Sequence, residues 1–268
     1  MQNFRIYGKP PFAVAAVHGG PGAAGEMEPV ARHLALEFGV LEPLQTATTL
    51  NGQVEELEAV LRENADPPIT LIGFSWGAWL SYIVTARNQT LVKKLILVGS
   101  GPYEQHYVNR ITETRMSRLT QNEQIEYHSI IQNLGIPNAV GKAEKFARLG
   151  RLATKTDSFD PIEVEYTKPE SNKSSSSVVN PFHAVLKEAQ EMRKSGVLLS
   201  LADQIQCPVI ALHGDFDPHP AEGVRESLSG KLEDFCFIML KKCGHKPWIE
   251  RQAQEDFFTI LRGELHAP

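Results

Sequence analysis

Short apolar runs alternate with amphipathic stretches along the first part of the chain and again near its C-terminus. This alternation is typical of βαβ units and a largely parallel sheet, because parallel strands need a helical crossover between them. Strands are expected at Phe12–Val17, Val40–Leu44, Ile69–Phe74, Leu95–Val98, Val209–Leu212 and Phe235–Leu240. Helices are expected over Val54–Leu61, where apolar residues have the spacing of one helix face, over Trp79–Ala86, from about Ala221 and from about Pro247.

The pattern changes between Tyr103 and about Gly196, where strand-like runs stop and helices with polar loops are expected. One helix should have an apolar face made of Ile125, Ile130, Ile131 and Leu134, and further helices should span Asn138 to about Leu152 and Phe182–Arg193. The stretch Lys168–Ser177 has little to bury and is expected to be mobile. The predicted architecture is therefore an α/β core domain, 1–102 and 197–268, interrupted by a helical insertion, 103–196.

Composition and charge exclude several classes of function. The sequence has 27 Lys and Arg against 32 Asp and Glu, and this net charge of −5 gives no basic surface for nucleic acid or an anionic membrane. The three cysteines have no metal-ligand spacing, and an odd count argues against a secreted disulfide framework, so a reduced, cytoplasmic compartment is expected. The apolar run Phe12–Val17 is too short to span a membrane. Neither nucleic acid nor a membrane is therefore an expected partner, and the small-molecule ester, amide or short peptide that is expected as substrate follows from the motifs described next.

The segment Gly73-Phe74-Ser75-Trp76-Gly77 matches the pattern G-x-S-x-G. It lies where an expected strand ends and a helix begins, so the turn is tight and small residues at both ends let the backbone approach while Ser75 projects its hydroxyl. The simpler alternative is a glycine-rich turn whose serine only caps the helix. The strand-to-helix context favours Ser75 as a nucleophile.

A second glycine-rich loop, His18-Gly19-Gly20-Pro21-Gly22, follows an earlier expected strand. A backbone N–H of this loop can point at a reacting carbonyl because no Cβ blocks the approach. We assign this donor to Gly20, with Gly19 as the alternative, and the second donor of the oxyanion hole to the amide of Trp76. His18 is expected to brace the loop.

Two acids compete in the segment that leaves the strand ending at Leu212. Asp217 is favoured because it lies further into the loop, whereas Asp215 is expected to accept backbone hydrogen bonds, as Asp commonly does in turns. His245 follows the strand Phe235–Leu240, at the edge where α/β sheets bind their ligands. The chain order serine, acid, histidine predicts that His245 is the base and Asp217 orients it, without any cofactor or metal.

These motifs resemble the α/β-hydrolase superfamily, and specifically its prolyl iminopeptidase (S33) branch, which carries HGGPG and GxSWG motifs. The resemblance spans residues 1 to about 102 and about 197 to 268, and it implies an eight-stranded type of sheet with a helical cap over the active site. One departure concerns the D-x-R-G-x-G loop of that branch, because the corresponding region here is Leu41–Thr48.

The resemblance implies that the insertion contacts the substrate and that its carboxylates hold the free amine of a peptide. Candidate contacts are Tyr103, Glu104, Tyr107 and Glu113. The predicted function is hydrolysis of a small ester or amide, with proline-type aminopeptidase activity as its most specific version. The alternatives are a carboxylesterase, a cofactor-free lyase or C–C bond enzyme that uses the same triad, and a non-catalytic ligand receptor.

Overall fold

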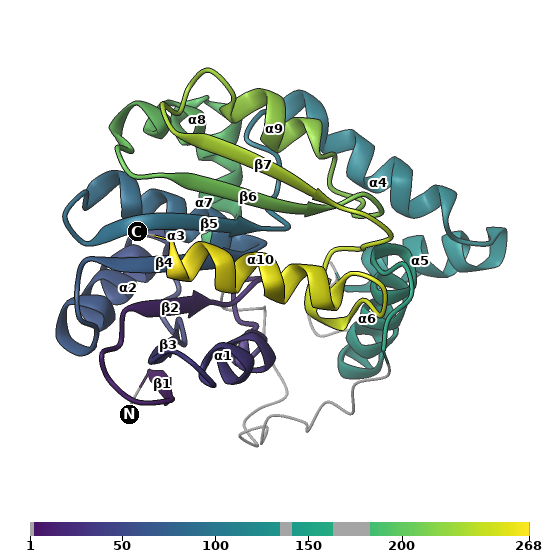
Figure 1. The fold of residues 1–268 in the computed structure, drawn as a ribbon. Coiled ribbons are helices and arrows are strands. Elements are labelled where there is room, and N and C mark those ends of the chain that lie inside the picture. Colours follow the sequence, from purple (N-terminus) through teal and green to yellow (C-terminus); the bar gives the residue numbers. More distant parts are fainter. Residues whose placement is uncertain (1–2, 135–140, 163–182, 268) are drawn as a thin grey trace.

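The computed structural model describes residues 3–134, 141–162 and 183–267 (Figure 1). The strands are β1 (Phe4–Tyr7), β2 (Val14–Val17), β3 (Val40–Pro43), β4 (Ile69–Phe74), β5 (Val92–Val98), β6 (Val209–Gly214) and β7 (Phe235–Leu240). The helices that surround them are α1 (Glu28–Leu34), α2 (Leu50–Asn64), α3 (Trp76–Arg87), α8 (Val197–Ser200), α9 (Glu222–Leu228) and α10 (Gln254–His266). Between β5 and β6 come α4 (Val108–Ser117), α5 (Gln121–Leu134), α6 (Lys142–Asp157) and α7 (His183–Lys194).

The described residues form one seven-stranded sheet in the order β1-β3-β2-β4-β5-β6-β7. β1 pairs antiparallel with β3, and all other neighbours are parallel. After β2 the chain moves outward to β3 and then crosses back to β4, on the other side of β2. The order therefore reverses between β2 and β4, and α/β sheets bind ligands outside the carboxyl ends of the strands at such a point.

The central strands β2, β3 and β4 are buried on both faces of the sheet, as their apolar residues require. Alternate residues of each strand face opposite ways, so Leu71 packs in one cluster with α2, α3 and α9, and Ile72 in another with α1 and α10. Figure 1 shows α10 and α1 crossing in front of the strands. Among the described residues, no helix has both the length and the apolar content that a membrane span needs.

The insertion divides into two parts. In Figure 1, α5 and α6 lie beyond the arrowheads of β6 and β7, at the carboxyl ends of the strands. α7 instead packs against α2, and its residues Val185 and Ala189 belong to the same apolar cluster as the sheet. The division of the chain into domains at residues 103 and 196 stays a prediction.

Several sequence expectations need correction. The predicted apolar face of α5 is wrong in part, because Ile130 is buried while Ile125 is 63% exposed and Ile131 is 44% exposed. The last helix begins at Gln254 and not at about Pro247, where a 3₁₀ turn, Pro247–Ile249, stands instead. β1 and α1 were not expected, and the described sheet has seven strands where the resemblance implied eight. The stretch Lys168–Ser177 lies outside the described residues.

Candidate active site

Ser75 stands in a strained turn between β4 and α3. Its backbone has φ 53° and ψ −113°, a conformation that residues other than glycine rarely adopt. A Cβ at Gly73 would collide with the carbonyl oxygen of Gly77, and a Cβ at Gly77 would collide with those of Val17 and His18. The two glycines are therefore required for the close approach of backbone that raises Ser75 above the sheet edge.

A chain of hydrogen bonds joins the three residues predicted to form a triad. The Nε2 atom of His245 lies 3.1 Å from the Oγ atom of Ser75, and its Nδ1 atom lies 2.7 Å from Oδ2 of Asp217. The backbone N–H of His245 donates to the carbonyl of Asp157 at 2.7 Å, and its ring packs 4.8 Å from that of Phe74. Since the ionised carboxylate only accepts, His245 donates from Nδ1 and presents the lone pair of Nε2 to Ser75.

The carboxyl group of Asp217 is fully buried among histidines. Burial alone would raise its pKa, but interactions with His245, His219 and His213 outweigh burial and hold the pKa well below its ordinary range. Asp215 instead accepts a hydrogen bond from the backbone N–H of Cys243 at 3.2 Å. The geometry thus joins Asp217, and not Asp215, to His245.

The loop after β2 contains Gly20 in a left-handed turn, with φ 32°. His18 braces this loop from below, because its Nδ1 lies 2.8 Å from the carbonyl oxygen of Gly19 and its Nε2 accepts the backbone N–H of Gln45. Burial lowers the pKa of His18, which keeps the ring neutral and suited to these two roles. Gly19, the alternative donor, is buried, whereas Gly20 is exposed.

Trp76 is the first residue of α3, directly after Ser75. The first N–H groups of a helix have no acceptor within it, so the amide of Trp76 is available to a ligand beside Ser75. Its indole Nε1 donates to the side chain of Gln53 at 3.0 Å, which anchors α3 to α2.

The four candidate substrate contacts of the insertion are occupied elsewhere or lie at the surface. Tyr103 is fully buried, with its ring 4.9 Å from that of Tyr82 in the core. Glu104 accepts a hydrogen bond from Ser227 at 2.9 Å, and Tyr107 donates to Glu226 at 3.0 Å, so both are bound to α9. Glu113 is exposed on α4. The structure does not bring these four side chains to Ser75.

Sequence reasoning missed other residues that contact the site. Arg115 of α4 forms a two-pronged ion pair with Asp157 of α6, at 2.9 and 2.5 Å, and the carbonyl of Asp157 holds the backbone of His245. His219 contacts Asp217, and it stands two residues after it in a segment that the sequence analysis had already singled out. No pattern in the sequence pointed to Arg115 and Asp157, because they lie far apart along the chain and meet only in the folded structure.

The buried carboxylate of Glu250 accepts three backbone N–H groups. They belong to Gly244 at 3.0 Å, in the loop of His245, and to Phe159 and Asp160 at 2.9 and 2.8 Å, just after α6. Glu250 therefore fastens the end of α6 to the loop that carries His245.

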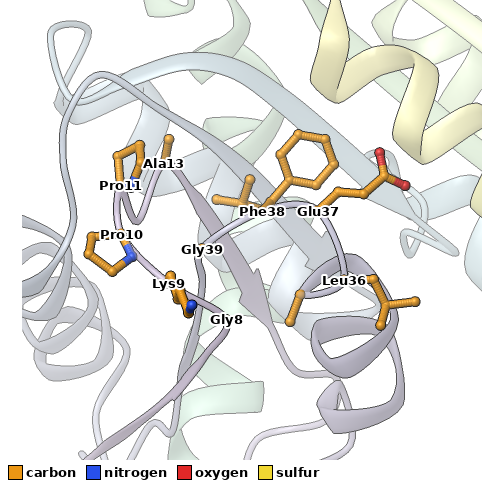
Figure 2. Close-up of a pocket in the computed structure, with 11 residues that line it drawn as sticks. Gly8, Lys9, Pro10, Pro11, Ala13, Leu36, Glu37, Phe38 and Gly39 are labelled. Atoms are coloured by element: carbon orange, nitrogen blue, oxygen red, sulfur yellow. The ribbon is translucent and has the colours of Figure 1, made fainter.

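Two cavities adjoin the triad. One, of about 600 Å³, is lined by α6 residues such as Ala153 and Asp157 together with His245 and Ile249. The other, of about 270 Å³, is lined by Asp217 and its neighbours Pro218 and His219. A third, of about 600 Å³, is lined by the chain around Pro10 and Phe38 at the amino end of β2, opposite the edge that holds Ser75 (Figure 2).

Asp217, His219 and His245 have the side-chain types of a metal site, and their ligand atoms all lie within 4.8 Å of one another. However, both histidine nitrogens are 2.7 Å from a carboxylate oxygen, which is a hydrogen-bond distance. Ligands about 2.0–2.2 Å from a shared zinc ion lie more than about 3 Å apart. The arrangement fits protons between these atoms and not a metal ion.

No protein-family model matches the sequence, and no curated protein matches it. Among solved structures, VinJ is similar with a TM-score of 0.69 and 16% identity, over 98% of this chain and 93% of VinJ. MGS-MChE2, an alpha/beta hydrolase enzyme from a sediment metagenome, has a TM-score of 0.58 and 15% identity, over 97% and 93%. The proline iminopeptidase of Mycobacterium smegmatis has a TM-score of 0.62 and 15% identity, over 98% and 93%.

These similarities confirm the predicted fold: the chain has the α/β-hydrolase fold, with a mostly parallel sheet and helices inserted after β5. At such low identities they bear on the fold alone. The iminopeptidase matches no better than VinJ does, so the comparisons support the fold and do not single out the iminopeptidase branch.

Proposed function

We propose that the protein is a serine hydrolase that cleaves a small ester or amide through an acyl intermediate on Ser75. The single observation that carries this proposal is the hydrogen-bond chain from Ser75 Oγ through His245 to Asp217, with steps of 3.1 and 2.7 Å. The strained backbone of Ser75 supports the same role, because strain of this kind gathers at functional sites.

In the proposed reaction, His245 Nε2 takes the proton of Ser75 while Oγ attacks the carbonyl carbon of the substrate. The amides of Gly20 and Trp76 stabilise the negative oxygen of the tetrahedral intermediate. His245 then gives its proton to the leaving group as the bond to carbon breaks. In the second half, His245 takes a proton from water, the hydroxide attacks the acyl carbon, and Ser75 recovers its proton. Asp217 holds the imidazole in the required tautomer throughout.

Simple esters are the substrate class that we propose first. Recognition of a free amine would need a carboxylate pair near Ser75, because the cost of removing a positively charged ammonium group from water must be offset by negative charges. Glu104 is bound to Ser227 and Glu113 is exposed, which weakens the aminopeptidase version. We propose that the insertion, 103–196, influences substrate choice through α6, which lines the cavity beside His245.

The proposal is tested by the turnover of acetyl and butyryl p-nitrophenyl esters, proline p-nitroanilide and a cleavable ketone, with wild-type protein and Ser75→Ala. We expect a burst of p-nitrophenol and steady ester turnover in the wild type, both lost in the variant. Ketone cleavage without ester turnover would identify a lyase or another C–C bond enzyme instead. Absence of turnover on every substrate, with ligand binding unaffected in Ser75→Ala, would favour a receptor.

A further inference from the structure

The carboxylate of Asp217 has two imidazole rings at hydrogen-bond distance, and a third, that of His213, has its Nε2 3.7 Å from Oδ2. Its Oδ2 faces His245, while its Oδ1 lies 2.7 Å from Nδ1 of His219 and also accepts the backbone N–H of His219 at 2.9 Å. A triad needs only the first of these contacts, so the ring of His219 is an addition to it.

The rings of His219 and His245 are stacked, with centroids 4.5 Å apart and planes inclined by 27°. The side chain of His219 is 15% exposed, and its backbone carbonyl lies 2.9 Å from Nε2 of His213. The stacking on His245 and the hydrogen bond to Asp217 therefore hold the ring, while His213 holds the backbone of His219. Because an ionised carboxylate can only accept, the neutral His219 ring must carry its proton on Nδ1.

We propose that His219 is a positioning residue that divides the charge of Asp217 between two imidazoles, so that His245 remains a free base at lower pH. The inference rests on the hydrolase function proposed above. A hydrogen bond from His219 withdraws negative charge from the carboxylate, which then stabilises a protonated His245 less strongly. The enzyme thereby keeps the neutral His245 that accepts the proton of Ser75.

The surroundings of His219 keep it neutral for this purpose. Burial lowers its pKa, Asp217 opposes that effect, and His245 and Arg115 add to it. His213 contacts the backbone carbonyl of His219, and the charged residues Arg110, Arg118, Asp215 and Glu222 line the same cavity as His219. When His219 does gain a second proton at low pH, its positive charge beside His245 further opposes protonation of that ring.

Two variants separate this role from a structural one. His219→Leu removes the ring donor, whereas His219→Asn keeps an N–H donor at the same distance along the side chain. Both retain the backbone N–H that holds Oδ1. In His219→Leu, the acid limb of kcat/KM should move to higher pH, with about a fivefold loss at a fixed pH on that limb, equivalent to about 0.7 of a pH unit. In His219→Asn the limb should stay where it is in the wild type.

A second measurement locates the proton on the ring of His219 and does not depend on enzyme activity. In protein labelled with ¹⁵N-histidine, NMR should show His219 as the Nδ1–H tautomer, identified by the signal that disappears in His219→Asn. An Nε2–H tautomer, an unmoved or oppositely moved limb in His219→Leu, or equal limbs in the two variants would overturn the inference. Failure of the proposed function is distinct, because wild-type ester turnover would then be absent while the NMR result stands by itself.

Discussion

The two halves of the site are built differently. Ser75, Asp217 and His245 follow the carboxyl ends of β4, β6 and β7, where the parallel pairing of the strands fixes the positions of the loops. The insertion meets this edge through side chains that belong to separate helices. Glu104, which was expected to face the substrate, instead accepts a hydrogen bond from Ser227. Residues at strand ends are therefore placed by topology, while those of the insertion are placed by packing.

The two halves are nevertheless joined at His245. Its backbone N–H is held by the carbonyl of Asp157, at the end of α6, and Glu250 holds both its loop and the residues that follow α6. The insertion thus supports His245, the proposed base, although it supplies no member of the proposed triad. Replacing residues in each half should therefore show which residues affect kcat and which affect mainly the stability of the fold.

The largest effect is expected in the strand-end half. Asp217→Asn should lower kcat by about four orders of magnitude, because the amide no longer holds His245 in the tautomer that accepts the proton of Ser75. Asp215→Asn is the matched control, since Asp215 contacts the backbone of Cys243 and should affect stability more than kcat. Steady-state kinetics and urea denaturation of both variants check this. A larger loss of kcat in Asp215→Asn would reverse the assignment of the acid.

An intermediate effect is expected when Glu250, which connects the two halves, is replaced. Glu250→Gln replaces a buried carboxylate that accepts three N–H groups by an amide that has one acceptor oxygen. We expect a loss of about 2–3 kcal/mol in the free energy of unfolding, the cost of unsatisfied buried groups. Glu255→Gln, on the exposed side of α10, is the matched control and should cost less than about 0.5 kcal/mol. Equal unfolding free energies for the two variants in urea denaturation would contradict the role of Glu250.

The smallest effect is expected in the insertion itself. Glu104→Gln can still accept the hydroxyl of Ser227, and Glu113 is exposed, so neither Glu104→Gln nor Glu113→Gln should change kcat/KM by more than about twofold. The measurement compares an acetyl ester with proline p-nitroanilide. A selective rise in KM for the proline substrate would restore the amine-binding role that the resemblance implied.

The sequence was sufficient where local patterns and topology act together. The strand Ile69–Phe74 and the strand Phe235–Leu240 have the predicted bounds, because apolar runs flanked by glycine or polar residues leave little choice. Ser75 could be located from the glycines that its turn requires. β1 was missed because a four-residue edge strand that begins Phe4-Arg5 is too short to show a period.

Longer-range contacts could not be predicted in the same way. Ile130 and Ile131 each lie within one helical turn of Leu134, but only tertiary packing decides that Ile130 is buried and Ile131 is exposed. Glu250 lies within the helix that was expected from about Pro247. Its carboxylate instead accepts N–H groups from Asp160 and Phe159, 90 and 91 positions away, and the helix begins four residues after Glu250. The contact of His219 with Asp217 depends on rotamers that no spacing reveals.

The central claim is that Ser75 is a nucleophile activated by His245. The most direct measurement treats the purified protein with a fluorophosphonate probe and maps the modified peptide by mass spectrometry. We expect one adduct, on Ser75, that is absent in Ser75→Ala and forms much more slowly in His245→Ala. A wild-type protein that stays unlabelled where a control serine hydrolase reacts, or an adduct on a different serine, would contradict it.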